Sequence, residues 1–292
     1  MPTPLRLAFL CVVAGLFSRR VQSRLQAWVG GGPRRVWTVP VGLASLLWLT
    51  LWLADAWGFS IAVVAAAHLL VPAAVVVANR RRSAALDFCA ILILWLPIEF
   101  AGAARALLPA EAQGLIYEMA EAAAVVLALF LFLIYRHLSG MKYNLPGTLG
   151  DFVNPLLGFL AAASILIPLG RALCFLGPFG LPEAFSPVHF VGTFAVILAG
   201  VALPEELLFR SLIQNRLMQC WGESNRTLLV AALIFGAAHL NNGPQPLPNW
   251  RYMILATIAG FLYGKVFQRS SSVMSSALLH ALVNTVRRIF FL

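Results

Sequence analysis

The sequence is poor in charge, and this lack excludes most classes of soluble protein. Only 11% of its 292 residues are charged, whereas a soluble domain carries about 25%. Hydrophobic residues make up 61% of the chain, and the mean hydropathy is +0.85. Apolar runs approaching the ~20 residues that cross a ~30 Å hydrocarbon core recur along the sequence. We therefore expect an all-α fold, a polytopic transmembrane helical bundle with about eight membrane spans.

Acidic residues are also scarce, with 11 against 21 basic ones, which gives a formal net charge of +10. The basic residues lie in short loops between apolar runs, as the positive-inside bias requires. We therefore predict a multi-pass protein of the cell membrane whose partner is the lipid bilayer, with no nucleic-acid partner. The four cysteines are scattered, with neither a Cys-x-x-Cys pair nor metal-ligand spacing, so we assign them no disulfide role.

One break in the helical pattern divides the chain. The stretch Asn144-Leu145-Pro146-Gly147 interrupts it, so we place a boundary near residue 150. Residues 1–150 are expected to hold a short helix on the membrane surface over residues 21–29, followed by about four spans. These spans are 37–53, 59–78, 86–104 and 115–135. Residues 151–292 are expected to hold the remaining spans, which include 188–203, 227–240, 252–267 and 273–291.

Two adjacent glutamates and an arginine follow the apolar run 188–203, where charge is unfavourable by about 2.5–3.5 kcal/mol per residue at mid-bilayer. Glu206 and Arg210 are four residues apart, so they share a helix face and can form an ion pair. Glu205 lies about 100° around the helix from Glu206. One glutamate can thus be neutralised structurally while its neighbour performs chemistry. The alternative is that these charges only mark the cytoplasmic end of a helix.

Two further polar positions follow in apolar sequence. Phe235 and His239 are expected deep in one helix, and His280 and Asn284 project from one face of another. Polar groups in a bilayer must face one another or a wet cavity, so we expect the three sites to converge. Histidines satisfied within the core are the alternative.

In this order on successive helices, the three motifs resemble those of the CAAX-protease and bacteriocin-processing intramembrane proteases, also called the CPBP or ABI family. The motifs are Glu205-Glu206-x-x-x-Arg210, Phe235-x-x-x-His239 and His280-x-x-x-Asn284. The resemblance covers roughly the last half of the chain and does not extend into the first 150 residues. It implies an endopeptidase acting on a peptide or protein substrate in or at the membrane, with an active site that opens toward the cytoplasmic side.

The resemblance also implies roles for individual residues. Glu205 would be the base that activates water, and His239 would help to hold that water. His280 and Asn284 would donate hydrogen bonds to the tetrahedral oxyanion. Structural support would come from the Glu206–Arg210 pair and from Phe235, which would buttress the imidazole of His239. A serine or cysteine nucleophile is not expected, because no Gly-x-Ser-x-Gly occurs and no cysteine lies within the motifs.

Three alternatives remain open. No cofactor is expected, but Glu205, His239 and His280 could instead hold zinc in a metalloprotease of the same family. Against zinc, His-Glu-x-x-His is absent and no carboxylate is evident as a partner of either histidine. The chain could also be a non-catalytic transport or immunity protein that retains the motifs. Finally, scarce lysine and abundant alanine indicate a GC-rich bacterial genome, so cleavage of prenylated CAAX proteins, the activity of the eukaryotic branch, is not our first expectation.

Overall fold

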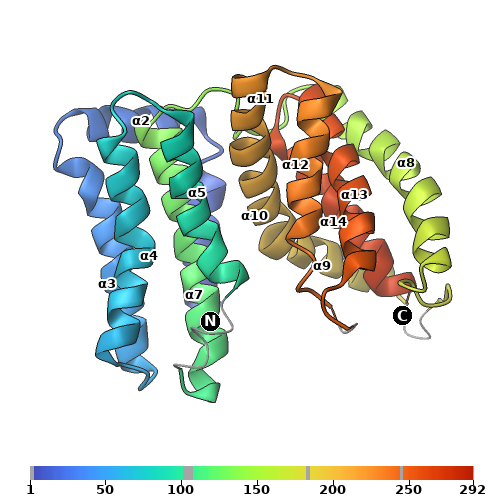
Figure 1. Cartoon of the computed structure of the whole chain (residues 1–292), viewed down its shortest axis with the longest axis horizontal. Coiled ribbons are helices and arrows are strands. Elements are labelled where there is room, and N and C mark those ends of the chain that lie inside the picture. The colour runs from blue at the N-terminus through green and yellow to red at the C-terminus, as the bar shows by residue number, and fades with distance from the viewer. Residues whose placement is uncertain (1–2, 101–107, 182–184, 244–245, 292) are drawn as a thin grey trace. The chain divides into compact units, whose positions relative to one another are not determined.

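The computed structural model describes residues 3–100, 108–181, 185–243 and 246–291, and within these residues the elements are helices (Figure 1). The predicted all-α class is thereby confirmed. Five helices in the described part of the chain are long and apolar enough to cross a membrane, and the figure of about eight spans stays a prediction. These five are Arg35–Leu53, Phe59–Ala78, Ala110–Tyr135, Gly150–Ala172 and Pro187–Trp221.

The chain separates into two compact units, Met1–Ser139 and Gly140–Leu292. The helices of the first unit are α1 (Thr3–Gly15), α2 (Arg19–Gly30), α3 (Thr38–Leu53), α4 (Phe59–Ala78), α5 (Ala84–Glu99) and α7 (Ala110–Ala128), which continues into a π-helical segment (Leu129–Tyr135). Helix α3 packs against α4 and α7, and α4 packs against α5. The last residues of the predicted span 86–104 lie outside the described residues.

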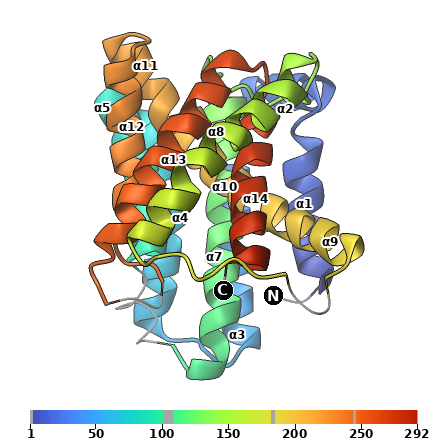
Figure 2. The ribbon, with the colours of Figure 1, turned by 90° about the vertical axis from the view of Figure 1, so that its right-hand side faces the viewer.

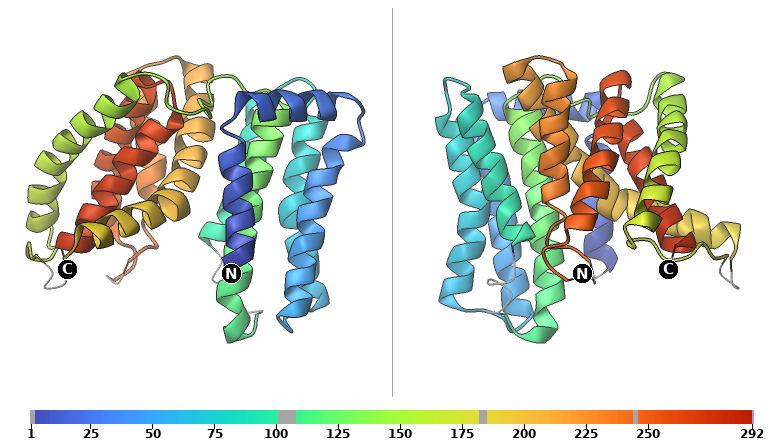
Figure 3. Two further views of the ribbon diagram at one scale, coloured as in Figure 1. Left: turned by 180° about the vertical axis from the view of Figure 1, so that it is seen from behind. Right: turned by 45° about the vertical axis from the view of Figure 1, so that its right-hand side comes forward.

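Helix α2 corresponds to the predicted surface helix. It runs across the ends of the upright helices of its unit (dark blue in Figure 3), and Val29 is its only buried residue. A buried ion pair stabilises the same unit, because Arg136 donates to both carboxylate oxygens of Asp87, at 3.0 and 3.1 Å. Arg136, which the sequence placed among loop charges, is 8% exposed.

The second unit contains α8 (Gly150–Ala172), α9 (Pro187–Ile197), α10 (Leu203–Glu206), α11 (Asn215–Trp221), α12 (Asn225–Ala237), α13 (Trp250–Arg269) and α14 (Val273–Phe290). Helix α12 packs along α13, and α8 lies across α13 and α14 (Figure 2). The outer side of α8 exposes large apolar side chains such as Leu156 and Leu160. Such a surface suits contact with lipid.

Two side chains fix the turn from which α14 starts. The ammonium of Lys142 donates to the carbonyl oxygens of Phe267 and Ser270, at 2.7 and 2.9 Å, and so satisfies the C-terminal end of α13. Asp151 accepts from the backbone N–H and the hydroxyl of Ser271, both at 2.6 Å. Burial lowers the pKa of Lys142, and Glu223 and Asp151 offset part of that shift. The start of α14, which carries His280, is therefore held by charge-assisted hydrogen bonds.

Candidate active site

One continuous helical stretch carries the two glutamates. The helix Pro187–Trp221 is interrupted by two π-helical segments, Leu198–Ala202 and Leu207–Gln214, which flank α10. The expectation that the glutamates end a helix is therefore wrong, because the helix continues past Arg210. Pro204 is tolerated in the first turn of α10, beside the π segment, where the helix changes direction between α9 and α10 (Figure 3). π segments of this kind occur often at functional sites.

Glu206 and Arg210 form the ion pair that their spacing predicted. The Nε atom of Arg210 lies 3.0 Å from Oε2 of Glu206, and both side chains are fully buried. The guanidinium also lies over the ring of Phe235, with Cζ 4.9 Å from the ring centroid. Because both charges are removed from water, each depends on the other for its stabilisation.

His280 lies between the two glutamates. Its Nδ1 is 3.1 Å from Oε1 of Glu206, and its Nε2 is 3.9 Å from Oε2 of Glu205. The side chain of Glu205 is 31% exposed, whereas that of Glu206 is fully buried. The two neighbours thus point in different directions, as the 100° helical offset requires, and they approach opposite nitrogens of one imidazole. The contact between Glu206 and His280 was missed by the sequence reasoning.

His239 lies just beyond α12 rather than within it. Helix α12 ends at Ala237, and the N–H of His239 bonds to the carbonyl of Gly236 at 3.0 Å in a tighter turn. The expectation of a position deep in a helix is wrong here, because the following Asn-Asn-Gly sequence ends the helix, with Gly243 at φ +100°. His239 nevertheless remains buried, with 6% of its surface exposed.

Phe235 supports both imidazoles. Its ring centroid lies 4.7 Å from that of His239 and 5.9 Å from that of His280. Its carbonyl oxygen is 2.8 Å from Nδ1 of His239. A carbonyl only accepts, so Nδ1 of His239 carries the proton, and in the neutral ring Nε2 then presents a lone pair. Phe235 therefore contacts the imidazole of His239, as a buttress would, and its supporting role stays a prediction.

Two glycines let α12 and α13 approach closely enough for this arrangement. A Cβ atom on Gly236 would lie 2.7 Å from the carbonyl oxygen of Met253, and one on Gly260 would lie 2.8 Å from a ring carbon of Phe235. Either contact is shorter than side chains allow, so larger residues here would push the two helices apart.

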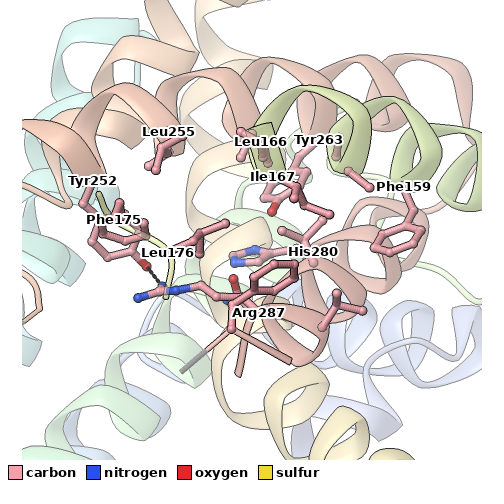
Figure 4. Close-up of a pocket in the computed structure, with 18 of the residues that line it drawn as sticks. Phe159, Leu166, Ile167, Phe175, Leu176, Tyr252, Leu255, Tyr263, His280 and Arg287 are labelled. Carbon is pink, nitrogen blue, oxygen red and sulfur yellow. Dashed lines mark hydrogen bonds between the residues drawn. The ribbon is translucent and has the colours of Figure 1, made fainter. Parts of the chain in front are cut away.

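A pocket adjoins these groups and is lined by His239, His280 and Asn284. Figure 4 shows His280 at its wall. The rest of its wall is largely apolar, as is typical of ligand pockets. Helix α14 contributes His280 and Asn284 from one face, one turn apart, as their spacing predicted.

Sequence reasoning missed two tyrosines at this pocket. The ring of Tyr263 stacks on His280 with centroids 4.8 Å apart, and the ring of Tyr252 meets His239 edge-on at 4.5 Å. The signal that could have found them is their spacing on α13, because eleven residues make about three helical turns and place both on one face.

The geometry supports the zinc alternative in one respect and opposes it in another. The statement that no carboxylate partners a histidine is wrong for His280, since Glu206 contacts its Nδ1 at 3.1 Å. Both Nδ1 atoms therefore have acceptors, as metal-binding histidines require. Within the described ranges, however, no group of three His, Cys, Asp or Glu side chains is arranged to hold a metal ion. No chemical step is therefore assigned to a metal.

The fold and the site define a multi-pass helical membrane protein with a buried glutamate–histidine centre. Residues 187–286 match the family described as type II CAAX prenyl endopeptidase Rce1-like. This matched segment, about a third of the chain, contains all three motifs, and the resemblance seen in the motifs is confirmed. At the family level the match supports a CAAX-type intramembrane protease with a membrane-associated substrate. Comparison with curated proteins and with solved structures gave no match.

Proposed function

We propose that this protein is an intramembrane endopeptidase that hydrolyses peptide bonds of membrane-associated substrates with water activated by Glu205. The observation that carries the proposal is the position of His280 between Glu205 and the buried Glu206–Arg210 pair, at the wall of an apolar pocket. This arrangement combines a partly exposed carboxylate with fixed hydrogen-bond donors, which are the groups that amide hydrolysis needs.

The chemistry follows from the hydrogen bonds. Glu205 removes a proton from water as the oxygen attacks the substrate carbonyl carbon, and the lone pair on Nε2 of His239 accepts from the same water. The protonated Glu205 then gives its proton to the leaving nitrogen as the C–N bond breaks. Asn284 supplies an amide N–H to the oxyanion that forms in between.

His280 must be an imidazolium to serve as an oxyanion donor. Its Nδ1 already donates to Glu206, so only a second proton, on Nε2, can reach the oxyanion. In that state the net charge of four groups is zero, because the carboxylates of Glu205 and Glu206 balance the cations of Arg210 and His280. Once Glu205 has taken the proton from water, the four groups carry one positive charge, which complements the single negative charge of the tetrahedral intermediate.

The proposed activity is tested with purified protein in proteoliposomes incubated with a membrane-derived peptide mixture. Mass spectrometry should detect new peptide ends that are absent with a Glu205→Ala control. A transporter or immunity protein that merely retains the motifs would produce no new ends with either protein.

The direction in which the site opens stays a prediction. The pocket is lined by the C-terminal halves of α12 and α14, away from the α11–α12 connection. Arg216 on α11 and Arg226 on α12 flank that connection, which the positive-inside bias places in the cytoplasm. Arg287 and Arg288 lie at the opposite end of the unit, on α14. A cytoplasmic α11–α12 connection would therefore place the pocket toward the opposite side of the membrane, so it conflicts with the predicted cytoplasmic opening of the site.

Metal removal separates the two forms of the mechanism. We expect prolonged treatment with a permeant chelator to leave peptide cleavage unchanged and elemental analysis to find well under one zinc ion per active chain. Zinc held by Glu205, His239 and His280 would instead give near-stoichiometric metal, chelator inactivation and rescue by added zinc. Asn284→Ala serves as the companion variant, because removing an oxyanion donor lowers turnover by about 10²–10³-fold and leaves apparent binding nearly unchanged. Chelator inactivation with rescue by zinc would overturn the metal-free mechanism and leave the family assignment intact.

A further inference from the structure

The pocket beside the candidate active site contains one fixed charge. Its wall is formed mainly by aliphatic and aromatic side chains of α8, α13 and α14. Among the described residues that line it, Arg287 is the only one with a permanent charge. A cation beside an apolar wall is unfavourable unless other groups compensate its charge, so the contacts of Arg287 decide what it can bind.

Arg287 is held in place by aromatic groups. Its Nη1 donates to the hydroxyl of Tyr252 at 3.2 Å (dashed line in Figure 4). Its guanidinium lies 4.6 Å from the ring centroid of Phe175 and 4.9 Å from that of Tyr252. Within the described part of the chain, no carboxylate forms an ion pair with it. Among the described residues, only Tyr252 accepts from Arg287, so the other guanidinium N–H donors can bind a ligand.

The position of Arg287 relates it to the reaction centre. His280, Asn284 and Arg287 follow at intervals of four and three residues, so they occupy one face of α14. Seven residues of α-helix advance about 10 Å, so a peptide whose carbonyl lies at His280 and Asn284 can extend along the pocket to the guanidinium. Tyr252 connects the two regions, because its ring contacts His239 and its hydroxyl accepts from Arg287.

We propose that Arg287 is a specificity-determining residue that binds a carboxylate of the peptide substrate while the apolar wall receives neighbouring side chains. The proposal rests on the proposed endopeptidase function. The planar guanidinium matches a carboxylate in two parallel hydrogen bonds, and such charge-assisted bonds are the strong ones in a poorly hydrated pocket. The carboxylate belongs to the free C-terminus of the peptide or to an acidic side chain, and the experiment separates these two sources.

Arg288 provides a matched control. It is the adjacent residue on the same last turn of α14, but it is exposed and does not line the pocket. Both arginines are favourably placed at the negative end of the helix dipole. Any general effect of losing a cation from this helix end therefore appears in both variants, whereas loss of carboxylate binding appears only at Arg287.

The test measures binding of three labelled, alanine- and leucine-rich peptides to the Glu205→Gln protein in nanodiscs. One peptide has a free C-terminal carboxylate, the second is its C-terminal amide, and the third is amidated with one internal glutamate. We expect the carboxylate-bearing peptides to bind more tightly than the neutral amide. Arg287→Met should weaken their binding by about 10- to 100-fold without changing that of the amide, Arg287→Lys should retain part of the preference, and Arg288→Met should change none of the three.

The proposal is overturned if the protein with an intact Arg287 binds the carboxylate-bearing peptides no more tightly than the neutral amide. It is also overturned if that protein binds none of the three peptides. Neither result depends on whether the Arg287 variants fold. Equal weakening of all three peptides by Arg287→Met overturns it as well, because that result describes a structural role. In protein with an intact Glu205, Arg287→Met should raise KM for the acidic peptide more than it lowers kcat. If the binding preference is found but no peptide is cleaved, the endopeptidase function fails and the assignment of Arg287 stands.

Discussion

Replacing Glu205 by glutamine should lower peptide cleavage by about 10²–10⁴-fold, the range that a general base contributes. The amide keeps the shape of the carboxylate but cannot accept a proton from water. The side chain is 31% exposed, and so we expect the free energy of unfolding to change by less than about 1 kcal/mol. The measurement is the rate of appearance of new peptide ends, together with thermal melting in detergent.

Glu111→Gln is the control for this variant, since it makes the same chemical change at an exposed position of α7. Its cleavage rate should equal that of the unsubstituted protein. Near-normal turnover in Glu205→Gln would exclude Glu205 as the base. Retention of a cellular effect by a stably expressed Glu205 variant would instead favour the non-catalytic alternative.

Replacing either Glu206 or Arg210 by alanine should destabilise the fold by about 3–5 kcal/mol, because the remaining partner becomes an uncompensated buried charge. Both side chains are fully buried and lie 3.0 Å apart. Loss of Glu206 also removes the acceptor of Nδ1 of His280, at 3.1 Å. We expect low yields and early melting in detergent for both single variants.

The double variant Glu206→Leu with Arg210→Met separates stability from activity. It removes both charges and keeps similar volumes, a change that is often neutral or stabilising in other proteins. It should therefore melt closer to the unsubstituted protein than either single variant, while cleavage stays lost because His280 has no anionic partner. If a single variant folds normally and loses only activity, the structural role of the ion pair is wrong.

Local signals in the sequence identified most of the helices and the chemical groups of the site. Helix α4 occupies the predicted residues 59–78, because Gly58 and Asn79 bound a run that is apolar except for Ser60 and His68. The pairing of Glu206 with Arg210 followed from spacing alone, since residues four apart share a helix face. The family resemblance followed from the order of three short motifs, and the match over residues 187–286 confirmed it.

Only the tertiary structure decided how these groups meet. The sequence could not show that the helix continues through Pro204, which lies at the start of α10 between two π segments. It also could not show that α12 ends before His239. The contact of Glu206 with His280 joins residues 74 positions apart, and spacing carries no information at that separation. The pocket that joins His280 to Arg287 likewise depends on how α8, α13 and α14 pack. Helical periodicity determines which residues share a face, whereas long-range packing determines what that face contacts.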